Sequence, residues 1–594
     1  MSDLDLIMIG NGTVAALLDR NARYNWACLP DFEGDPAFCD LLRSRSGEDP
    51  GFFDVLLDGH THSEQRYVPN TAVVITTLHD GKGNAVEIVD FAPRFKHLGR
   101  SFRPTMFVRS LRPVSGRPRI KVRLRPARDW GASGVETTRG SNHIRYLTSG
   151  SVLRCTTDLP VSHILKETDF LLDGPASMII GPDESLHDAV SGVARDFFEK
   201  TSDYWREWCR YLSLPFEWQD QVIRAAITLK LCNFEETGAI VAAMTTSIPE
   251  SPGSERNWDY RYCWLRDGYF VVSALNRLGA TRTMEGYLGY LNNIVATARN
   301  GHLQPVYGLS FNSELTEQKV ETLDGYRGTG PVRRGNQAYE HIQNDVYGSV
   351  ILSVTQVFFD KRLKRQGDET LFKFLEPLGE QCRALYDKPD AGLWELRGNA
   401  HIHTYSSVLC WAGIDRLARI ADHLGLEAPA DYWRNEATRV RTHILDEAYN
   451  KERDSFADAW GGDAVDASLL LLLELGFVDA EDPRFAGTVA AIEKDLKRGN
   501  YVFRYVKADD FGEPEKAFIV CTFWYIDALV KLDRRDDARK VFETMLENLN
   551  PAGLLSEHID VETGELWGNF PQTYSLVGLI NSAMELSKSW KEAF

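Results

Sequence analysis

Several features that would restrict the function are missing from this chain of 594 residues. Its nine cysteines are scattered and include no Cys-x-x-Cys pair, which argues against a disulfide framework and a zinc knuckle. No apolar run approaches the roughly 18 residues of a membrane span, and the N-terminus lacks a basic segment followed by an apolar one. We therefore expect a cytoplasmic protein with reduced thiols and no membrane partner.

Positive charge is also scarce. Lys and Arg number 67 against 85 Asp and Glu, which gives a formal net charge of −18. This balance argues against a nucleic acid or an anionic membrane surface as a partner and is compatible with a neutral ligand. Hydrophobic residues make up 43% and charged residues 26%, as in ordinary globular proteins, so we expect a compactly folded chain.

The pattern of apolar residues changes along the chain. Residues 1–190 contain short alternating or β-branched runs separated by Gly, Pro, Asn and Asp, which predict an antiparallel β-sandwich. The clearest runs are 71–77, 85–90, 119–124 and 177–180. A charged segment with helical periodicity follows and predicts a linker helix within residues 191–215.

Residues 216–594 show twelve apolar segments with helical periodicity, which suit six helical hairpins closed into a ring. An open helical solenoid is the alternative. The predicted helices lie near 218–234, 264–279, 282–298, 341–360, 369–386, 403–423, 430–447, 465–475, 486–496, 515–532, 535–548 and 572–588. Long loops carry the polar and aromatic residues that a site needs, and they cover 299–340, 387–402, 497–514 and 549–571.

Residues 256–267 read Arg-Asn-Trp-Asp-Tyr-Arg-Tyr-Cys-Trp-Leu-Arg-Asp and combine four aromatic rings with three Arg and two Asp. Aromatic faces stack on pyranose rings, and Arg and carboxylate groups exchange charge-assisted hydrogen bonds with sugar hydroxyls. A structural interpretation fits equally well, because the aromatic residues alternate with period two, as in a half-buried strand whose charges pair with each other. This segment alone leaves both interpretations open.

Hydrolysis of a glycosidic bond usually takes two carboxyl groups, one to protonate the leaving oxygen and one to act on water or on the anomeric carbon. Glu395 lies in Gly392-Leu-Trp-Glu-Leu-Arg397, just before a predicted helix and flanked by Trp394 and Arg397. A Trp-Glu dipeptide by itself is a weak sign of catalysis. Glu395 is therefore a candidate acid that needs support from the rest of the chain.

Six motifs in order resemble bacterial members of glycoside hydrolase family 15, a family of glucoamylases, glucodextranases and some trehalases. They are the segment 256–267 together with Gln343-Asn-Asp-Val-Tyr-Gly348, Leu393-Trp-Glu-Leu-Arg397, Ala517-Phe-Ile-Val-Cys-Thr-Phe-Trp524, Leu554-Leu-Ser-Glu557 and Gly568-Asn-Phe-Pro-Gln572. Residues 6–16 and 24–30 also look like the β-sandwich that precedes the catalytic ring in the trehalase-like branch. The resemblance covers nearly the whole chain.

The resemblance implies an N-terminal β-sandwich followed, over residues 216–594, by a catalytic (α/α)6 barrel that removes one glucose at a time with inversion at the anomeric carbon. Glu395 aligns with the general acid of the family and Glu557 with its general base. Inversion needs a gap of about 6.5–9.5 Å between the two carboxyl groups, which leaves room for the attacking water.

The same match suggests the substrate-binding residues. Arg266 and Asp267 are expected to hold the terminal glucose, and Arg504 to contact the leaving side. The remaining candidates form the walls or flank the acid, and they are Trp258, Trp394, Arg397 and Trp567. Asp345 has an equally good structural explanation, as a cap of the helix that starts near Val346.

The expected activity is that of a glucoamylase-type hydrolase that releases β-glucose from the non-reducing end of soluble α-glucosides. An α,α-trehalase or an isomaltose- or dextran-type glucohydrolase on the same fold is the alternative. A phosphorylase and an inactive glycan-binding protein are more remote alternatives. Family chemistry needs no cofactor, and no His/Glu spacing near the motifs resembles a metal site, so we predict neither a cofactor nor a catalytic metal. A homodimer is a further prediction.

Overall fold

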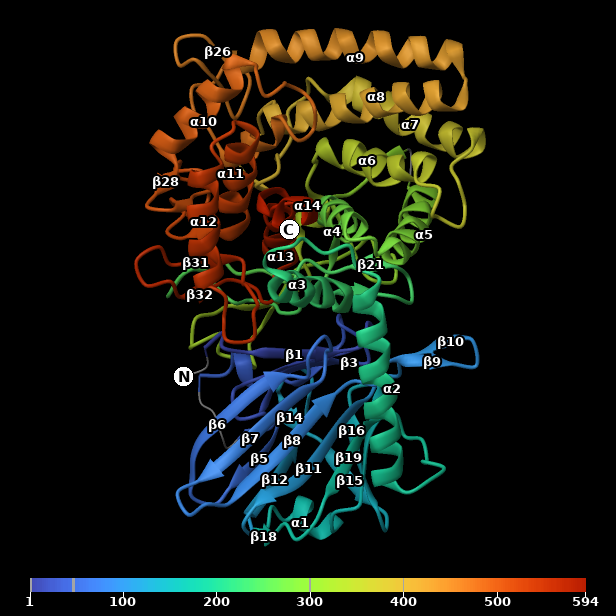
Figure 1. Ribbon diagram of the computed structural model, residues 1–594, viewed down its shortest axis with the longest axis vertical. Helices are drawn as coiled ribbons and strands as arrows, with labels where there is room; N and C mark the ends of the chain where they lie inside the picture. The colour runs from blue at the N-terminus through green and yellow to red at the C-terminus, as the bar shows by residue number, and fades with distance from the viewer. Residues whose placement is uncertain (1–2, 45–48, 299–300, 399) are drawn as a thin grey trace.

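The computed structural model describes residues 3–44, 49–298, 301–398 and 400–594. A domain of β-strands and a domain of α-helices lie one above the other in Figure 1, and the long helix α2 (Val190–Arg210) connects them. The predicted loops 299–340 and 387–402 include residues 299–300 and 399, which lie outside the described residues. Residues 1–2 and 45–48 of the predicted sandwich segment also lie outside them.

Two antiparallel sheets form the first domain. One has the strand order β1-β2-β3-β5-β12-β18, with β4 paired to β3, and the other has the order β15-β16-β17-β19-β11-β8-β7-β6. The strands of the first are β1 (Ile7–Gly10), β2 (Ala15–Leu18), β3 (Tyr24–Leu29), β4 (Asp35–Phe38), β5 (Phe52–Leu57), β12 (Arg119–Arg125) and β18 (Phe170–Leu171). Those of the second are β6 (His60–Tyr67), β7 (Val74–Asp80), β8 (Ala85–Phe91), β11 (Phe107–Ser115), β15 (Glu136–Arg139), β16 (His143–Thr148), β17 (Ser151–Thr157) and β19 (Ala176–Gly181).

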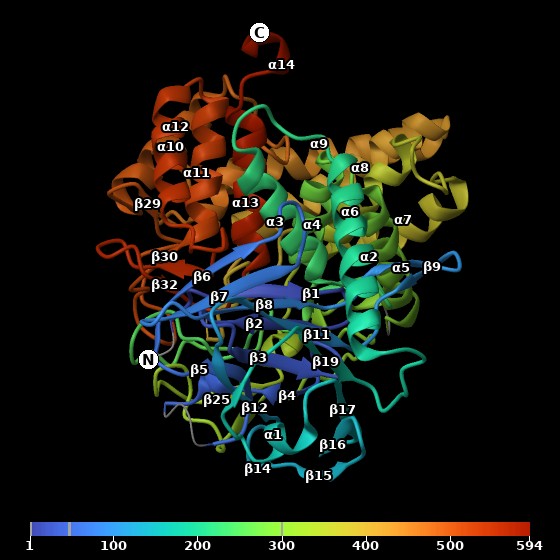
Figure 2. The ribbon, with the colours of Figure 1, turned by 60° about the horizontal axis from the view of Figure 1, so that its bottom comes forward.

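Alternation of apolar side chains explains how the two sheets meet. In β12 every second residue is buried, and Ile120, Val122 and Leu124 join Val86 and Ile88 of the other sheet in one apolar core. Helix α2 lies against β19 and β11 on the outer face of the larger sheet, as Figure 2 shows. The strand-rich part of the chain is thus a β-sandwich, as the sequence predicts.

Eleven α-helices and the 3₁₀-helix η4 (Ala467–Leu472) build the helical layer of the second domain within the described residues. The α-helices are α3 (Gln219–Leu231), α4 (Leu265–Arg277), α5 (Thr281–Thr297), α6 (Asp345–Phe359), α7 (Glu369–Leu385), α8 (Thr404–Leu424), α9 (Glu427–Ala448), α10 (Pro483–Asp495), α11 (Ile519–Lys531), α12 (Arg535–Glu547) and α13 (Thr573–Leu586). A short helix, α14 (Trp590–Ala593), ends the chain. Each of the twelve predicted segments coincides with one of these elements.

The segment 465–475, predicted as an α-helix, instead contains the 3₁₀-helix η4. The carboxylate of Asp466 accepts hydrogen bonds from the backbone N–H and the hydroxyl of Ser468, which holds the start of the segment in a tight turn. Gly476, at φ 77°, follows within a few residues and terminates it. All residues of η4 are buried, so its apolar character reflects complete burial rather than one face of a longer helix.

The helices form a closed ring. Helices α4, α6, α8, η4, α11 and α13 contact one another in this order, and α13 contacts α4, while α3, α5, α7, α9, α10 and α12 pack behind them. This is an arrangement of six helical hairpins with one inner and one outer helix each, so the predicted fold class is confirmed and the open solenoid is wrong. No helix in the described part of the chain is long and apolar enough to cross a membrane.

One apolar core joins the sandwich to the ring. It contains Met8 and Trp26 of the smaller sheet and Leu6 just before β1, together with residues of the inner helices. The indole N–H of Trp26 donates to the backbone carbonyl of Met244, at 2.8 Å. All nine cysteines are buried, and each carries a free thiol. The sandwich therefore acts as a fixed support for the loops at one end of the ring.

Candidate active site

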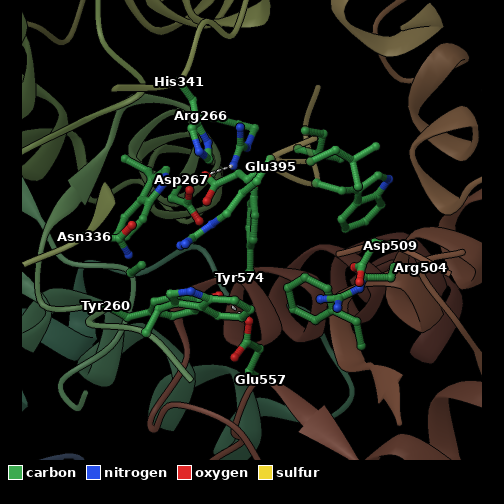
Figure 3. A pocket seen from close by; sticks show the side chains of 18 of the residues that line it. Tyr260, Arg266, Asp267, Asn336, His341, Glu395, Arg504, Asp509, Glu557 and Tyr574 are labelled. Atoms are coloured by element: carbon green, nitrogen blue, oxygen red, sulfur yellow. Dashed lines mark hydrogen bonds and ion pairs between the residues drawn. The ribbon is translucent and has the colours of Figure 1, made fainter. Parts of the chain in front are cut away.

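Loops from several helical hairpins converge on a pocket of about 100 Å³ at one end of the ring (Figure 3). Arg266 and Asp267 reach it from the first turn of α4, and Glu395 from the loop before α8. Glu557 and Arg504 come from the loops that precede α13 and α11. Residues far apart in the sequence thus meet because the ring is closed.

The predicted acid, Glu395, has an unusual backbone conformation. Its φ is 60°, in the left-handed region that non-glycine residues seldom adopt. Its Oε1 accepts hydrogen bonds from the indole N–H of Trp264 at 2.7 Å and from the amide of Gln343 at 3.2 Å. The guanidinium of Arg266 lies 3.7 Å from the same oxygen. The contacts with these described residues all go to Oε1, which leaves Oε2 as the oxygen suited to carry a proton.

The predicted base, Glu557, is buried more deeply. Its Oε1 accepts a hydrogen bond from the hydroxyl of Tyr260 at 2.7 Å. Burial raises the pKa of Tyr260 well above its ordinary value, and the nearby Glu557 carboxylate raises it further. Gly568 lies so close that a Cβ there would come within 2.7 Å of the Glu557 Cβ, so only glycine fits at this position.

The two carboxyl groups lie on opposite sides of the pocket in Figure 3. The rings that hold them, Tyr260 and Trp264, contact each other edge to face with centroids 5.5 Å apart. Since one short segment provides both rings, it fixes the positions of Glu395 and Glu557 relative to each other. The segment 256–267 therefore serves the carboxylates directly.

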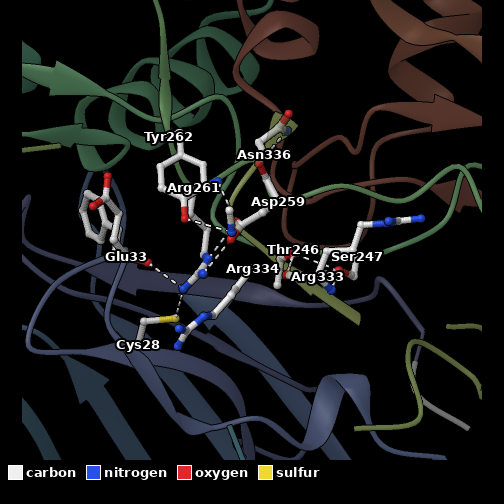
Figure 4. Close-up of polar contacts among 12 residues, drawn as sticks. Cys28, Glu33, Thr246, Ser247, Asp259, Arg261, Tyr262, Arg333, Arg334 and Asn336 are labelled. Carbon is white, nitrogen blue, oxygen red and sulfur yellow. Dashed lines mark hydrogen bonds and ion pairs between the residues drawn. The ribbon is translucent and has the colours of Figure 1, made fainter. Parts of the chain in front are cut away.

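The side chains of this segment point in two directions. Trp258, Tyr260 and Trp264 line the pocket, whereas Asp259 and Arg261 point to the sandwich (Figure 4). Tyr262 departs from the period of two, since it lies outside the pocket lining and its hydroxyl accepts a hydrogen bond from the backbone N–H of Gly335 at 3.1 Å. The segment therefore has residues with a place in the pocket and residues with a structural role.

Arg261 anchors the segment to the sandwich. It donates to both oxygens of Asp259, at 2.9 and 2.7 Å, and to the backbone carbonyls of Phe32 and Gly34, at 3.3 and 3.1 Å. Its guanidinium also lies over the Trp130 ring, 4.9 Å from the centroid. Both charged partners are almost completely buried, so removal of one would leave the other uncompensated.

A second buried group of charges surrounds Arg266. Its Nη1 donates to the Gln343 amide oxygen at 2.8 Å and lies 3.4 Å from Asp345. Burial raises the pKa of Asp267 to about 7 against the opposing effect of Arg266, with a further increase from Glu395. Burial likewise raises the pKa of Asp345 to about 6. Asp345 is not the helix cap that the sequence offered as an explanation. It is the first residue of α6, and its carboxylate faces Arg266.

Two of the three predicted tryptophan walls line the pocket. Trp258 does so next to Phe511, and Trp394 is oriented by a hydrogen bond from its indole N–H to Asp466 at 2.8 Å. Trp567 does not line the pocket. It belongs to β32 (Leu566–Trp567), where its ring packs on Tyr326 and its N–H donates to Glu565. The pattern around Trp567 gave no indication of which face of this short strand it occupies.

Arg397 and Arg504 both line the pocket. Arg504 pairs with Glu250 through both of its terminal nitrogens, at 2.9 and 3.1 Å. Glu250 was missed in the sequence, where Ser-Ile-Pro-Glu offers no local pattern for a buried carboxylate. Arg256 forms a two-point ion pair with Asp509, which brings the loop 505–511 over the pocket. The backbone N–H of Arg397 donates to Asp510 on that same loop, at 3.0 Å.

One group of described residues has ligand atoms close enough to share a metal ion. It consists of His62, Glu64 and His79 on the neighbouring strands β6 and β7 of the sandwich. None of the three lines the pocket that contains Glu395 and Glu557.

Asp267 gives a pH-dependent prediction for stability. Its pKa is raised on folding to about 7, so the folded state opposes its ionisation, and stability falls as pH rises from about 4 to about 7. Each unit of pKa shift corresponds to about 1.4 kcal/mol. We expect Asp267→Asn to be more stable than the wild type at pH 8, with a smaller advantage at pH 5, and to be less active. The measurement is thermal unfolding of both proteins at pH 5 and pH 8. A stability difference between variant and wild type that is the same at both pH values would contradict the prediction.

Arg261 gives a prediction for the support of the pocket. We expect Arg261→Ala to destabilise the protein by about 3–5 kcal/mol, because Asp259 then stays buried and unpaired. The control is Arg334→Ala nearby, which removes an exposed side chain bonded to Gln318. Thermal unfolding should show a clear loss only for Arg261→Ala, and equal midpoints for the two variants would refute the anchoring role.

Comparison with known proteins gives a family match for each domain. Residues 218–584 match the profile of the glycosyl hydrolases family 15, and residues 4–155 that of the trehalase-like N-terminal domain. A trehalase of Thermoplasma volcanium is 31% identical over 98% of this chain and 93% of its own. A trehalase of Mycolicibacterium smegmatis is 31% identical over 97% of this chain and 90% of its own.

Among solved structures, a bacterial glucoamylase complexed with acarbose superimposes with a TM-score of 0.69 at 13% identity, over 98% of this chain and 93% of its own. This likeness concerns the fold. The match to the family profile covers most of the helical domain and includes both predicted catalytic carboxylates. The chain belongs to glycosyl hydrolases family 15 and is a glycoside hydrolase.

Proposed function

We propose that the protein is an α,α-trehalase that hydrolyses trehalose with inversion at the attacked anomeric carbon. The observation that carries the proposal is the pair Glu395 and Glu557, held on opposite sides of one pocket by Trp264 and Tyr260. The choice of trehalose is supported by relatives named trehalase that match over nearly the whole chain. The glucoamylase-type activity that the sequence favoured is not confirmed.

In this proposal Glu395 is the general acid. Donors from Trp264 and Gln343 occupy its Oε1, so Oε2 holds the proton and gives it to the oxygen between the two glucose units as the bond to C1 breaks. Arg266 near Oε1 stabilises the carboxylate that this transfer creates. The left-handed backbone at Glu395 is the kind of strained conformation that is retained where a side chain must be aimed into a site.

Glu557 is the general base. It removes a proton from a water molecule whose oxygen attacks C1 from the face opposite the leaving group. The hydrogen bond from Tyr260 fixes Oε1 and thereby orients the carboxylate toward that water. Asp267 and Arg266 bind hydroxyls of the glucose that is attacked, since both line the pocket beside Glu395.

The part of the pocket that would hold the leaving glucose is covered by a loop, which favours a short substrate. The loop 505–511 is drawn over the pocket by Arg256 and Asp509, and Phe511 packs against Trp258 with ring centroids 5.5 Å apart. Arg504 and Asp509 offer partners for the hydroxyls of one further glucose. The predicted cytoplasmic location and the homodimer stay predictions.

A substrate panel with acid and base variants tests the proposal. We expect hydrolysis of trehalose to exceed that of maltose, maltotriose, isomaltose and kojibiose, without dependence on phosphate. Glu395→Gln and Glu557→Gln should each lower turnover of trehalose about 10²–10⁴-fold, because proton transfer to or from the reacting groups is lost.

Glu565→Gln is the matched control, because Glu565 lies on the same loop as Glu557 but bonds to Trp567 outside the pocket. It should retain nearly full turnover. Near-normal turnover of the Glu395 variant would refute its role as the acid. Preference for maltotriose would favour a glucoamylase, and glucose 1-phosphate as a product would favour a phosphorylase.

The loop 505–511 gives a prediction for substrate affinity. Asp509→Ala releases the Arg256 guanidinium and uncovers the leaving side, so we expect the KM for trehalose to rise about tenfold, which corresponds to about 1.4 kcal/mol, with a smaller change in kcat. Asp482→Ala, which breaks an ion pair with Arg484 away from the pocket, is the control. An unchanged KM in the Asp509 variant would remove this loop from substrate recognition.

A further inference from the structure

His558 follows the predicted base directly and is completely buried. It lies in β31 (His558–Ile559), between β30 (Ala517–Phe518) and β32. The Phe518 ring stacks on the imidazole with centroids 5.0 Å apart and an angle of 28° between the planes. This contact holds the plane of the imidazole against the Phe518 ring.

Each ring nitrogen of His558 faces a carboxylate. Nδ1 lies 3.5 Å from Oε2 of Glu557, and Nε2 lies 3.8 Å from Oε1 of Glu250. Neither nitrogen has a hydrogen-bond partner among the described residues, although buried polar atoms in proteins are nearly always paired. Both distances are longer than those of good hydrogen bonds, but the two carboxylates are the acidic groups nearest to the ring nitrogens among the described residues.

Glu250 on the far side of the ring is an anion held by arginines. Burial would raise its pKa, but the charges of Arg504, His558 and Arg256 outweigh that effect and lower it. Both of its oxygens contact Arg504. Glu250 therefore connects the leaving-side Arg504 to His558, which in turn contacts the base.

We propose that His558 is the positioning residue of the base Glu557 and that Glu250 anchors His558 and Arg504 in a common arrangement. A donor on Nδ1 of His558 holds Oε2 of Glu557, while Tyr260 holds Oε1 from the other side. The carboxylate is then fixed at both oxygens and keeps one lone-pair direction for the water molecule. The inference rests on the proposed function, in which Glu557 is the base.

This arrangement also couples the two halves of the pocket. Movement of Arg504 on the leaving side shifts Glu250 and, through His558, the orientation of Glu557. The charged and titratable groups that face His558 are Glu557 from its own loop, Glu250 from the segment before α4, and Arg504, which contacts Glu250, from the loop before α11. Loss of the imidazole should therefore alter how turnover depends on pH at the limb that reports the base.

The test uses α-D-glucosyl fluoride as well as trehalose. Fluoride leaves without a proton from an acid, so turnover of the fluoride depends on the base and hardly on Glu395. Glu395→Gln should keep most of its activity on the fluoride, and Glu557→Gln should lose it. A wild type that does not hydrolyse the fluoride would refute the proposed function itself, and with it this inference.

His558→Leu removes both nitrogens at similar volume. We expect kcat on the fluoride to fall about 10- to 100-fold, with KM within about threefold, and the acid limb of the pH profile to shift; the fall is less than the 10²–10⁴-fold of a direct acid–base group. His558→Asn keeps a donor near the position of Nδ1 and should restore part of the lost kcat. A role in packing alone would give equal losses in both variants and an unchanged pH profile, which would overturn the proposal.

Glu250→Gln keeps the inference testable if the His558 variants fold poorly. It should lower kcat on the fluoride and also raise the KM for trehalose, because Arg504 loses its anchor. The controls are His443→Gln on outer helix α9, whose Nδ1 lies 2.9 Å from the Tyr386 hydroxyl, and Glu235→Gln in a buried ion pair with Arg94. Wild-type kcat and KM in folded Glu250→Gln would overturn the role of Glu250.

Discussion

Two hydrogen bonds from one short segment determine the geometry of the pocket. Trp264 donates to Glu395 and Tyr260 donates to Glu557, and the two donors lie four residues apart on the same backbone. The separation of the carboxyl groups is therefore set locally, although the carboxylates themselves lie 131 and 297 residues away from their donors. An inverting hydrolase needs such control, because the gap between acid and base must admit one water molecule.

The segment can serve this purpose because its other face is fixed. Alternate residues leave Asp259 and Arg261 on the side of the sandwich, where their buried ion pair meets backbone carbonyls of Phe32 and Gly34. The sandwich thus supports the segment from behind, and none of its described residues lines the pocket. The buried acids near Arg266 have the opposite effect on stability, since the raised pKa of Asp267 shows that folding opposes its ionisation.

The fold could be predicted largely from sequence pattern. Long helices such as α8 and α13 have clear starts and apolar faces, and strands such as β12 alternate strictly, so local periodicity identified both domains. Closure of the ring could not follow from periodicity, because the contact between α13 and α4 joins segments some three hundred residues apart. It was expected because of the helix count and the family resemblance.

The candidate site shows the same division. Glu395 and Glu557 were selected through motifs shared with a family, since 85 acidic residues offered no other means of choice. Tyr260 was not selected as a site residue because nothing local reveals a partner in a distant loop. Glu250 was missed for the same reason, and Trp567 was misplaced because the direction of a side chain in a two-residue strand is not encoded by its neighbours.

The central claim is that Glu395 and Glu557 invert one anomeric centre of trehalose. The most direct measurement is proton NMR of the first products, recorded before the glucose anomers interconvert. The account predicts equal initial amounts of β-glucose, from the attacked unit, and α-glucose, from the leaving unit. Release of α-glucose alone would demonstrate retention and contradict the assignment of Glu557 as a base that activates water.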